Sequence, residues 1–424
     1  MEDKFYNKEV KLSNYIIDIA AGPFGSNLKV DCFIPEGFPI IDGANLKGFK
    51  VTDNITKFVT EEKARSLHRS IAKKNDVIVT ISGNVGQISY IPFDSIYDEY
   101  LVSQRQFRVT FDTTKVYVPY LVYYFHTKEG QYKILSFANQ TGVPALSQPL
   151  KNFKNIDIIL PELNVQKSIA SILEKLDSKI ELNRRINENL EQQAQALFKS
   201  WFVDFEPFKD GKFVDSELGM IPEGWKVKKL GELCDSISVT HPCKEGQLIF
   251  LNTGDIENGF VLNHKYMNIK DMPGQAKKSI QENDILYSEI RPINRHFAFV
   301  NFPAQEYIVS TKLMVLRAND NESSIRLYQY LTSEDVINEL QHEAESRSGT
   351  FPQIRFENIK SLKILIGSDN VEKQYTKYIG NIYKMIFQYR KEIMRLAQLR
   401  DTLLPRLMSG ELAITDVDDR SIFQ

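Results

Sequence analysis

Apolar residues recur at alternating steps of three and four through two long segments of the chain, and this pattern predicts two long helices. The first segment runs from Gln166 to Phe205, and the second runs from Asp369 to Leu407. Charged residues such as Glu174 occupy the opposite face, so each helix would carry one narrow apolar stripe. A helix of ~40 residues is ~60 Å long and needs a partner to cover such a stripe. The sequence therefore predicts that the two segments pair in one intramolecular coiled coil.

The seam residues are the positions at which this pattern places a side chain toward the partner helix. They are Ile169, Leu173, Leu176, Ile180, Leu190 and Leu197 in the first segment, and Ile379, Ile382, Ile386, Tyr389, Ile393, Leu396 and Leu403 in the second. Asn183 and Asn187 continue the first seam as polar residues, and they either fix the register of the pair or face water where the helices splay. We expect Asn164 to cap the first helix, and Pro405 with Gly410 to end the second.

Short sequences in the first half of the chain return in the second half at a nearly constant offset. Asn75-Asp76-Val77-Ile78 returns as Asn283-Asp284-Ile285-Leu286 (283 − 75 = 208), and Tyr100-Leu101-Val102-Ser103 returns as Tyr307-Ile308-Val309-Ser310 (307 − 100 = 207). Gly142-Val143-Pro144 and Val165-Gln166 have echoes at Gly349-Thr350-Phe351-Pro352 and Lys373-Gln374. These echoes predict a globular domain followed by a long helix, and then the same arrangement again.

The repeat predicts a chain of five parts, and each globular part contains short β-like runs and one helical region. The parts are 1–162, 163–207, 208–368, 369–412 and a tail at 413–424. Strands are expected at 39–41, 77–81, 88–91, 107–109 and 156–159, with a helix over 117–135. In the second domain, strands are expected at 249–251, 285–287, 297–300 and 313–316, with a helix over 325–340. The expected fold class is α+β, with two small mixed domains joined by the long helices.

The composition narrows the functional classes only a little. With 42% hydrophobic and 25% charged residues, the chain is typical of a globular protein, and no apolar run approaches the ~20 residues of a membrane span. A net charge of −2 argues mildly against nucleic-acid binding, although local basic patches are compatible with it. Cys32, Cys234 and Cys243 are widely spaced, which is typical of free thiols. We therefore expect a cytoplasmic protein without a membrane anchor.

The sequence lacks the motifs of the common catalytic sites. It contains no GxxxxGK[ST] phosphate loop and no NPPY- or DPPY-like run for amino-methylation of a base. Its histidines and cysteines are too scattered for the ligand spacing of a metal site. The sequence therefore predicts no catalytic residue, no metal and no cofactor of its own.

Two similar domains on a stiff spacer are suited to binding double-stranded DNA, because two major-groove sites one helical turn apart lie on the same face of DNA. In the first domain the candidate phosphate contacts are Lys63, Arg65, Arg69, Lys73 and Lys74, and the candidate base contacts are Asn84, Gln104, Arg105 and Gln140. In the second domain the candidates are Arg291, Asn294, Arg295, Lys312, Arg347 and Arg355. Clusters at equivalent places in both halves favour DNA contact over ordinary solvated side chains.

Four strings distributed along the chain resemble those of a known family. They are LPELNVQKSIASILEKLDSKIELN (Leu160 to Asn183), LFKSWFVDFEPF (Leu197 to Phe208), GMIPEGWKVKKLGEL (Gly219 to Leu233) and LRDTLLPRLMSGEL (Leu399 to Leu412). Together they are similar to the specificity (S) subunit of type I restriction–modification enzymes. PFGSNLK (Pro23 to Lys29) also resembles the start of one of the target recognition domains of that family.

The resemblance implies two target recognition domains that read a bipartite, asymmetric sequence of double-stranded DNA. It also implies that the two spacer helices are antiparallel and dock two methylation (M) subunits, with restriction/translocase (R) subunits outside them. S-adenosylmethionine, ATP and magnesium would then belong to the partner subunits, as would adenine-N6 methylation and ATP-dependent cleavage. Recognition domains vary within the family, so the contact residues above rest on chemistry and position alone. Two alternatives stay open, a single-chain nuclease or methyltransferase and a structural coiled-coil protein.

Overall fold

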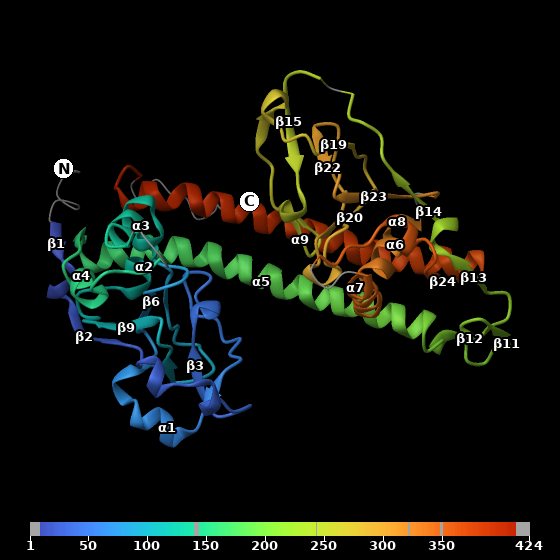
Figure 1. Ribbon diagram of the computed structural model, residues 1–424. Coiled ribbons are helices and arrows are strands. Elements are labelled where there is room, and N and C mark those ends of the chain that lie inside the picture. The colour runs from blue at the N-terminus through green and yellow to red at the C-terminus, as the bar shows by residue number, and fades with distance from the viewer. Residues whose placement is uncertain (1–8, 140–143, 243, 321–322, 348–350, 413–424) are drawn as a thin grey trace. The chain divides into compact units, whose positions relative to one another are not determined.

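The structure is a computed structural model that describes residues 9–139, 144–242, 244–320, 323–347 and 351–412. The chain forms two compact units, one made of residues 1–180 with 395–424 and the other made of residues 181–394. Helix α5 (Leu163–Phe202) and helix α9 (Asp369–Met408) each contribute residues to both units (Figure 1). Among the described residues, none of the helices combines the length and the apolar character needed to cross a bilayer.

The first domain is built from two four-stranded sheets. One sheet has the order β2-β9-β6-β7 and is antiparallel throughout, and the other has the order β4-β3-β8-β5 with β3 and β8 parallel. The strands are β2 (Ile16–Ala21), β3 (Phe38–Ile41), β4 (Phe58–Val59), β5 (Ile71–Lys73), β6 (Val77–Thr80), β7 (Ile88–Tyr90), β8 (Glu99–Val102) and β9 (Gln106–Phe111). Ile41, Ile78 and Tyr100 bring residues of both sheets into one buried cluster.

Helices and one further strand pair complete the first domain. They are α1 (Glu61–Ser66), α2 (Val118–His126), α3 (Lys128–Leu135) and α4 (Pro149–Lys154), together with the antiparallel pair β1 (Glu9–Lys11) and β10 (Asp157–Ile159). Helix α2 packs against β7 and α3, and its side chains are buried from Val118 to Phe125. The helix expected over 117–135 is therefore two helices, because Thr127 is extended and its hydroxyl accepts from the Gly130 N–H to start α3.

The second domain repeats the strand orders of the first. Its sheets are β14-β23-β20-β21 and β18-β15-β22-β19, with β15 and β22 as the parallel pair. The strands are β14 (Cys234–Ile237), β15 (Gln247–Leu251), β18 (Tyr266–Asn268), β19 (Ala276–Ser279), β20 (Ile285–Ser288), β21 (Phe297–Phe299), β22 (Tyr307–Ser310) and β23 (Leu313–Ala318). Further elements are β11 (Phe213–Ser216), β12 (Gly219–Pro222), β13 (Lys226–Lys229), β24 (Lys363–Ile366), α6 (Ser324–Leu331), α7 (Glu334–Arg347) and α8 (Phe356–Ile359). The internal repeat inferred from the sequence is confirmed.

The repeated Asn-Asp pair has the same structural role in both domains. Asn75 and Asn283 have φ of 72° and 71°, the left-handed conformation that asparagine tolerates better than most residues. The buried carboxylates of Asp76 and Asp284 accept the N–H of Lys73 and Gln281, each at 2.8 Å. Each pair therefore closes the turn that begins a central strand, which explains why this string recurs.

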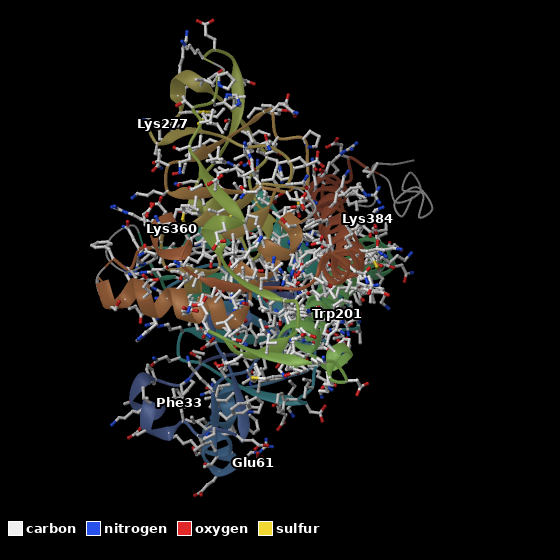
Figure 2. The ribbon with its side chains drawn as sticks, turned by 90° about the vertical axis from the view of Figure 1, so that its right-hand side faces the viewer. Phe33, Glu61, Trp201, Lys277, Lys360 and Lys384 are labelled. Carbon is white, nitrogen blue, oxygen red and sulfur yellow. The ribbon has the colours of Figure 1, made fainter. Side chains whose placement is uncertain are left out.

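Helices α5 and α9 pack against each other within each unit. In the second unit the Arg390 guanidinium lies 2.7 Å from the Glu191 carboxylate, and the Tyr375 ring packs edge-on against Phe202 with centroids 4.8 Å apart. Trp201, near the C-terminal end of α5 (Figure 2), lies 5.5 Å from the same tyrosine ring. Residue numbers fall along α9 as they rise along α5, so the two helices are antiparallel there.

The seam residues differ in burial. Ile169, Leu173, Leu176, Ile180, Leu190, Ile379, Ile386, Ile393, Leu396 and Leu403 are buried, while Leu197, Ile382 and Tyr389 are half-buried. Asn183 and Asn187 are 0% and 4% exposed, so they do not face water.

Two helix ends differ from expectation. Helix α5 begins at Leu163, so Asn164 lies inside the first turn and does not cap it. Pro405 lies inside α9 and does not end it. Buried Leu404 and Leu407 hold that last turn, and their packing outweighs the hydrogen bond that proline cannot donate. Gly410, with φ of 75°, follows the end of the helix, as expected of a terminating glycine.

Candidate nucleic-acid interface

The basic stretch predicted to contact phosphates is paired with carboxylates. Arg65, on α1, lies 2.8 Å from Glu61 and 2.5 Å from Glu99, and the side chains of Arg65 and Glu61 are exposed while that of Glu99 is half-buried. Glu61, the first residue of α1, is labelled in Figure 2. Lys73 lies 3.4 Å from Glu99, and Lys74 lies 2.8 Å from Asp98. Because Arg65, Lys73 and Lys74 each have an acidic neighbour, this part of the surface carries little net positive charge.

A junction of three loops holds three of the four candidate base contacts of the first domain, namely Asn84, Gln104 and Arg105. The loops are residues 81–87 between β6 and β7, the turn at 103–105 between β8 and β9, and the segment 144–148. Ile81 lies at the centre, since its N–H donates to the Arg105 carbonyl at 2.7 Å and its carbonyl accepts from the Leu146 N–H at 2.8 Å. The Gly83 N–H donates to the Pro144 carbonyl at 3.2 Å. We name this arrangement the loop junction.

The loop junction of the first domain presents polar side chains to solvent. Asn84, Gln104 and Arg105 are exposed on two of its three loops. The segment that follows β2 also approaches the turn at 103–105, because the Gly22 N–H donates to the Gln106 carbonyl at 2.8 Å. A Cβ at Gly22 would lie 1.9 Å from the Ser103 carbonyl oxygen, so only glycine allows this approach. Phe24 follows with 83% of its surface exposed, an aromatic group that the sequence analysis did not select.

The second domain has a loop junction with the same three hydrogen bonds. The Glu289 N–H donates to the Lys312 carbonyl at 3.0 Å, and the Glu289 carbonyl accepts from the Ile354 N–H at 2.8 Å. The Arg291 N–H donates to the Pro352 carbonyl at 3.1 Å. Each donor and acceptor stands 207 or 208 residues after its counterpart in the first domain, at Ile81, Arg105, Leu146, Gly83 and Pro144. The backbone frame is therefore shared, while the side chains on it differ.

The other candidate residues occupy several different environments. Arg291, Asn294 and Arg355 are exposed, and Lys312 is half-exposed with its ammonium 3.9 Å from the Glu289 carboxylate. Arg295 makes two contacts with the Glu334 carboxylate, at 2.5 and 2.7 Å, so its guanidinium ties the loop to α7. Arg69 is exposed and Lys63 is half-buried. Gln140 lies outside the described residues, as does the side chain of Arg347.

The first domain is attached to the helices by a network that the sequence analysis missed. The Asp177 carboxylate on α5 receives the Arg400 guanidinium of α9 at 2.7 Å and the Tyr123 hydroxyl of α2. The Glu174 carboxylate accepts from the Tyr117 hydroxyl at 3.1 Å. Glu174 is half-buried by these contacts, so it does not lie on a solvated face as its helical position suggested, and burial raises its pKa. Its partners lie about fifty residues or more away along the chain, beyond the reach of helical periodicity.

The second domain is attached through Arg390 of α9, which is 8% exposed. Its guanidinium donates to the carbonyl of Gly259 at 2.8 Å and of Asn258 at 3.1 Å, and it lies over the Phe260 ring at 4.6 Å. These residues belong to a hairpin of β16 (Ile256–Glu257) and β17 (Phe260–Val261). The exposed Asn-Gly turn of a hairpin is recognisable in the sequence, but its partner on α9 is not.

Comparison with known proteins places the chain in a family. The family model for the type I restriction modification DNA specificity domain matches residues 31–192 and 222–395, which is more than half of the chain. The MjaIX specificity subunit of a type I restriction enzyme from Methanocaldococcus jannaschii is 26% identical over 369 residues, covering 85% of this chain and 82% of that protein. The HindI specificity subunit from Haemophilus influenzae is 41% identical over 152 residues, or 35% of this chain and 33% of that protein.

A solved structure shares the fold. The S subunit of the type I restriction–modification system from M. genitalium aligns with a TM-score of 0.55 at 16% identity, over 96% of this chain and 97% of that chain. The matched domains, the repeated topology and the antiparallel helices agree with the resemblance carried by the four sequence strings. Specificity subunits recognise DNA and are not themselves catalysts. The chain belongs to the family of type I restriction–modification DNA specificity subunits.

Proposed function

We propose that this subunit reads a bipartite, asymmetric DNA sequence and is the scaffold on which two M subunits and the R subunits assemble. The observation that carries the proposal is the shared loop junction, whose backbone hydrogen bonds are the same in both domains. The side chains on this frame differ, because Gly83, Asn84 and Arg105 of the first domain stand where the second domain has Arg291, Pro292 and Lys312. Because different side chains at equivalent places read different base edges, two dissimilar half-sites follow.

In this proposal the paired helices set the distance between the two half-sites. Each helix has 40 residues and buried seam positions, so it resists bending better than a loop would. The cofactors S-adenosylmethionine, ATP and magnesium are placed on the partner subunits, together with adenine-N6 methylation and ATP-dependent cleavage. This subunit then contributes only the base contacts and the fixed separation of the two domains.

A methylation assay with the assembled complex tests this function. The half-sites are first obtained by mapping methylated adenines in cells with and without this chain and its M subunit. Duplexes are then made in which the two half-sites are moved apart one base pair at a time, with both half-sites otherwise unchanged. We expect methylation to fall sharply when the spacing changes, because a fixed spacer holds the domains at one separation. Methylation that is indifferent to the spacing would refute the proposed role of the helices.

A further inference from the structure

Arg291 occupies a backbone conformation that arginine rarely adopts. Its φ is 43° and its ψ is 81°, and it precedes Pro292. L-residues with a side chain are strained in the left-handed region, and the residue before a proline is restricted to extended conformations as well. Gly83 stands at the equivalent place in the first domain with φ of 89°. The first domain therefore has the residue that this backbone favours, and the second has an arginine.

The loop junction holds Arg291 in this conformation from both sides. Its N–H donates to Pro352, and the Glu289 backbone, two residues earlier, is bonded to Lys312 and Ile354. Four residues later, Arg295 is also left-handed, with φ of 54°, and its guanidinium is bound by Glu334. A surrounding structure that fixes a strained residue in this way is typical of functional sites. The strained residue has an exposed side chain.

The neighbourhood of Arg291 suits the edge of a base pair. Ile293, in the same loop, is 46% exposed, and Phe351, next to Pro352, is 71% exposed. Exposed apolar groups beside a guanidinium can contact a thymine methyl while the guanidinium reads the adjacent base. Arg291 combines an exposed side chain with a left-handed backbone at the place where the first domain has Gly83.

We propose that Arg291 is a specificity-determining residue of the second domain and reads a guanine in the half-site of that domain. This inference rests on the proposed function. The guanidinium fork donates two parallel hydrogen bonds to O6 and N7 of guanine in the major groove. Loss of one such contact lowers discrimination at that base roughly 5- to 150-fold. The junction of the first domain has glycine at this place, so its half-site is read through Asn84, Gln104 or Arg105 instead.

The test uses the complete methylation complex with Arg291→Gly. Glycine is the residue found at this place in the first domain and relieves the left-handed strain, so the variant is expected to fold and assemble. Methylated adenines are mapped genome-wide for the wild type, for Arg291→Gly and for the matched variant Arg105→Ala of the first domain. We expect Arg291→Gly to relax one guanine position in one half-site and to leave the other half-site unchanged. Arg105→Ala is expected to affect only the opposite half-site.

Several results would overturn the assignment. The proposal fails if Arg291→Gly methylates the wild-type sequence with unchanged preference, if the relaxed base is not guanine, or if both variants alter the same half-site. If Arg291→Gly assembles but does not methylate, Arg291→Lys is mapped instead, since lysine keeps the charge and loses the fork. In that case an unchanged preference refutes the proposal, and relaxation at guanine supports it. A wild-type complex that methylates no bipartite sequence would instead refute the proposed function before any variant is compared.

Discussion

Substitution of Arg390 by methionine is expected to loosen the second domain from α9. Arg390 donates to two carbonyls of the Asn258–Gly259 turn and to Glu191. Both turn residues are left-handed, with φ of 46° and 83°, which is the conformation of a tight two-residue hairpin. The same turn donates its N–H groups to Arg295 and Phe297, each at 2.8 Å. Arg390 therefore supports, through one hairpin, the loop that presents Arg291.

The free energy lost when Arg390 is replaced follows from the burial of its contacts. Removal of one partner from a buried charge pair costs about 3–5 kcal/mol, and hydrogen bonds from charged groups contribute about 1.5–3 kcal/mol each. The Glu191 side chain is 31% exposed, so water solvates it when Arg390 is absent, and the lower end of the range applies. We expect the local free energy of opening to fall by about 3 kcal/mol, which corresponds to roughly 100-fold faster amide exchange.

Hydrogen exchange measured by mass spectrometry on the full chain is the suitable assay, because the change is local. Peptides covering residues 256–261 and 289–297 should exchange faster in Arg390→Met, while peptides from β8 and β9 of the first domain should not change. Arg395→Met is the matched control, since it removes an exposed arginine from the same helix. Arg390→Lys should be intermediate, because it retains the charge without the fork. Unchanged exchange at residues 256–261 in Arg390→Met would refute the reasoning.

Two further predictions concern the first domain. A Cβ at Gly130 would lie 2.3 Å from the Tyr124 carbonyl oxygen and 2.6 Å from the Phe125 Cα, so Gly130→Ala should separate α3 from α2 and lower stability by about 1–3 kcal/mol. Gly48→Ala, where no atom lies within 4 Å of the added methyl, should leave the calorimetric melting temperature unchanged, and equal melting of both variants would contradict this packing. Burial lowers the pKa of His126, whose ring N–H donates to the Ile88 carbonyl at 2.8 Å, so the unfolded chain binds a proton more readily than the folded one. The contribution of neutral His126 to the free energy of unfolding is present above a pH of about 6.5, and it is lost as the pH falls toward the pKa of His126 in the folded chain. The denaturant midpoint should therefore fall less on acidification in His126→Gln than in the wild type, and parallel pH profiles would show that His126 does not titrate on unfolding.

Carboxylates locally neutralise part of the basic stretch of the first domain. Cations that lie close together in the sequence, such as Arg65 and Lys73, share the carboxylate of Glu99 in space. Recognition is therefore assigned to a few exposed side chains on a rigid backbone frame and not to a broad basic surface. A binding mode of this kind gives sequence discrimination with little non-specific affinity, since phosphate contacts dominate the latter.

The sequence by itself determined the two long helices, most of their seam and the internal repeat. Helical periodicity is a local property, so Ile169, Leu176 and Ile386 could be assigned to a buried face without knowledge of the fold. The repeat required only that the chain be compared with itself, and strings such as Asn75-Asp76 return because the same turn begins the same strand in both domains. The prediction that Pro405 ends the second helix was wrong, because tertiary packing outweighed the local preference of proline.

The tertiary structure decided which of the candidate cations lie beside carboxylates. Arg65 and Arg295 have suitable chemistry, but carboxylates far along the chain, at Glu99 and Glu334, bind them. Arg291 was one candidate among many until the structure showed its exposed side chain on a left-handed backbone, at the place where the first domain has Gly83. Glu174 is half-buried against tyrosines of the first domain although its helical position suggested a solvated face. Partners of this kind are brought together by chain folding over long sequence separations, and residue spacing within one helix or loop carries no information about them.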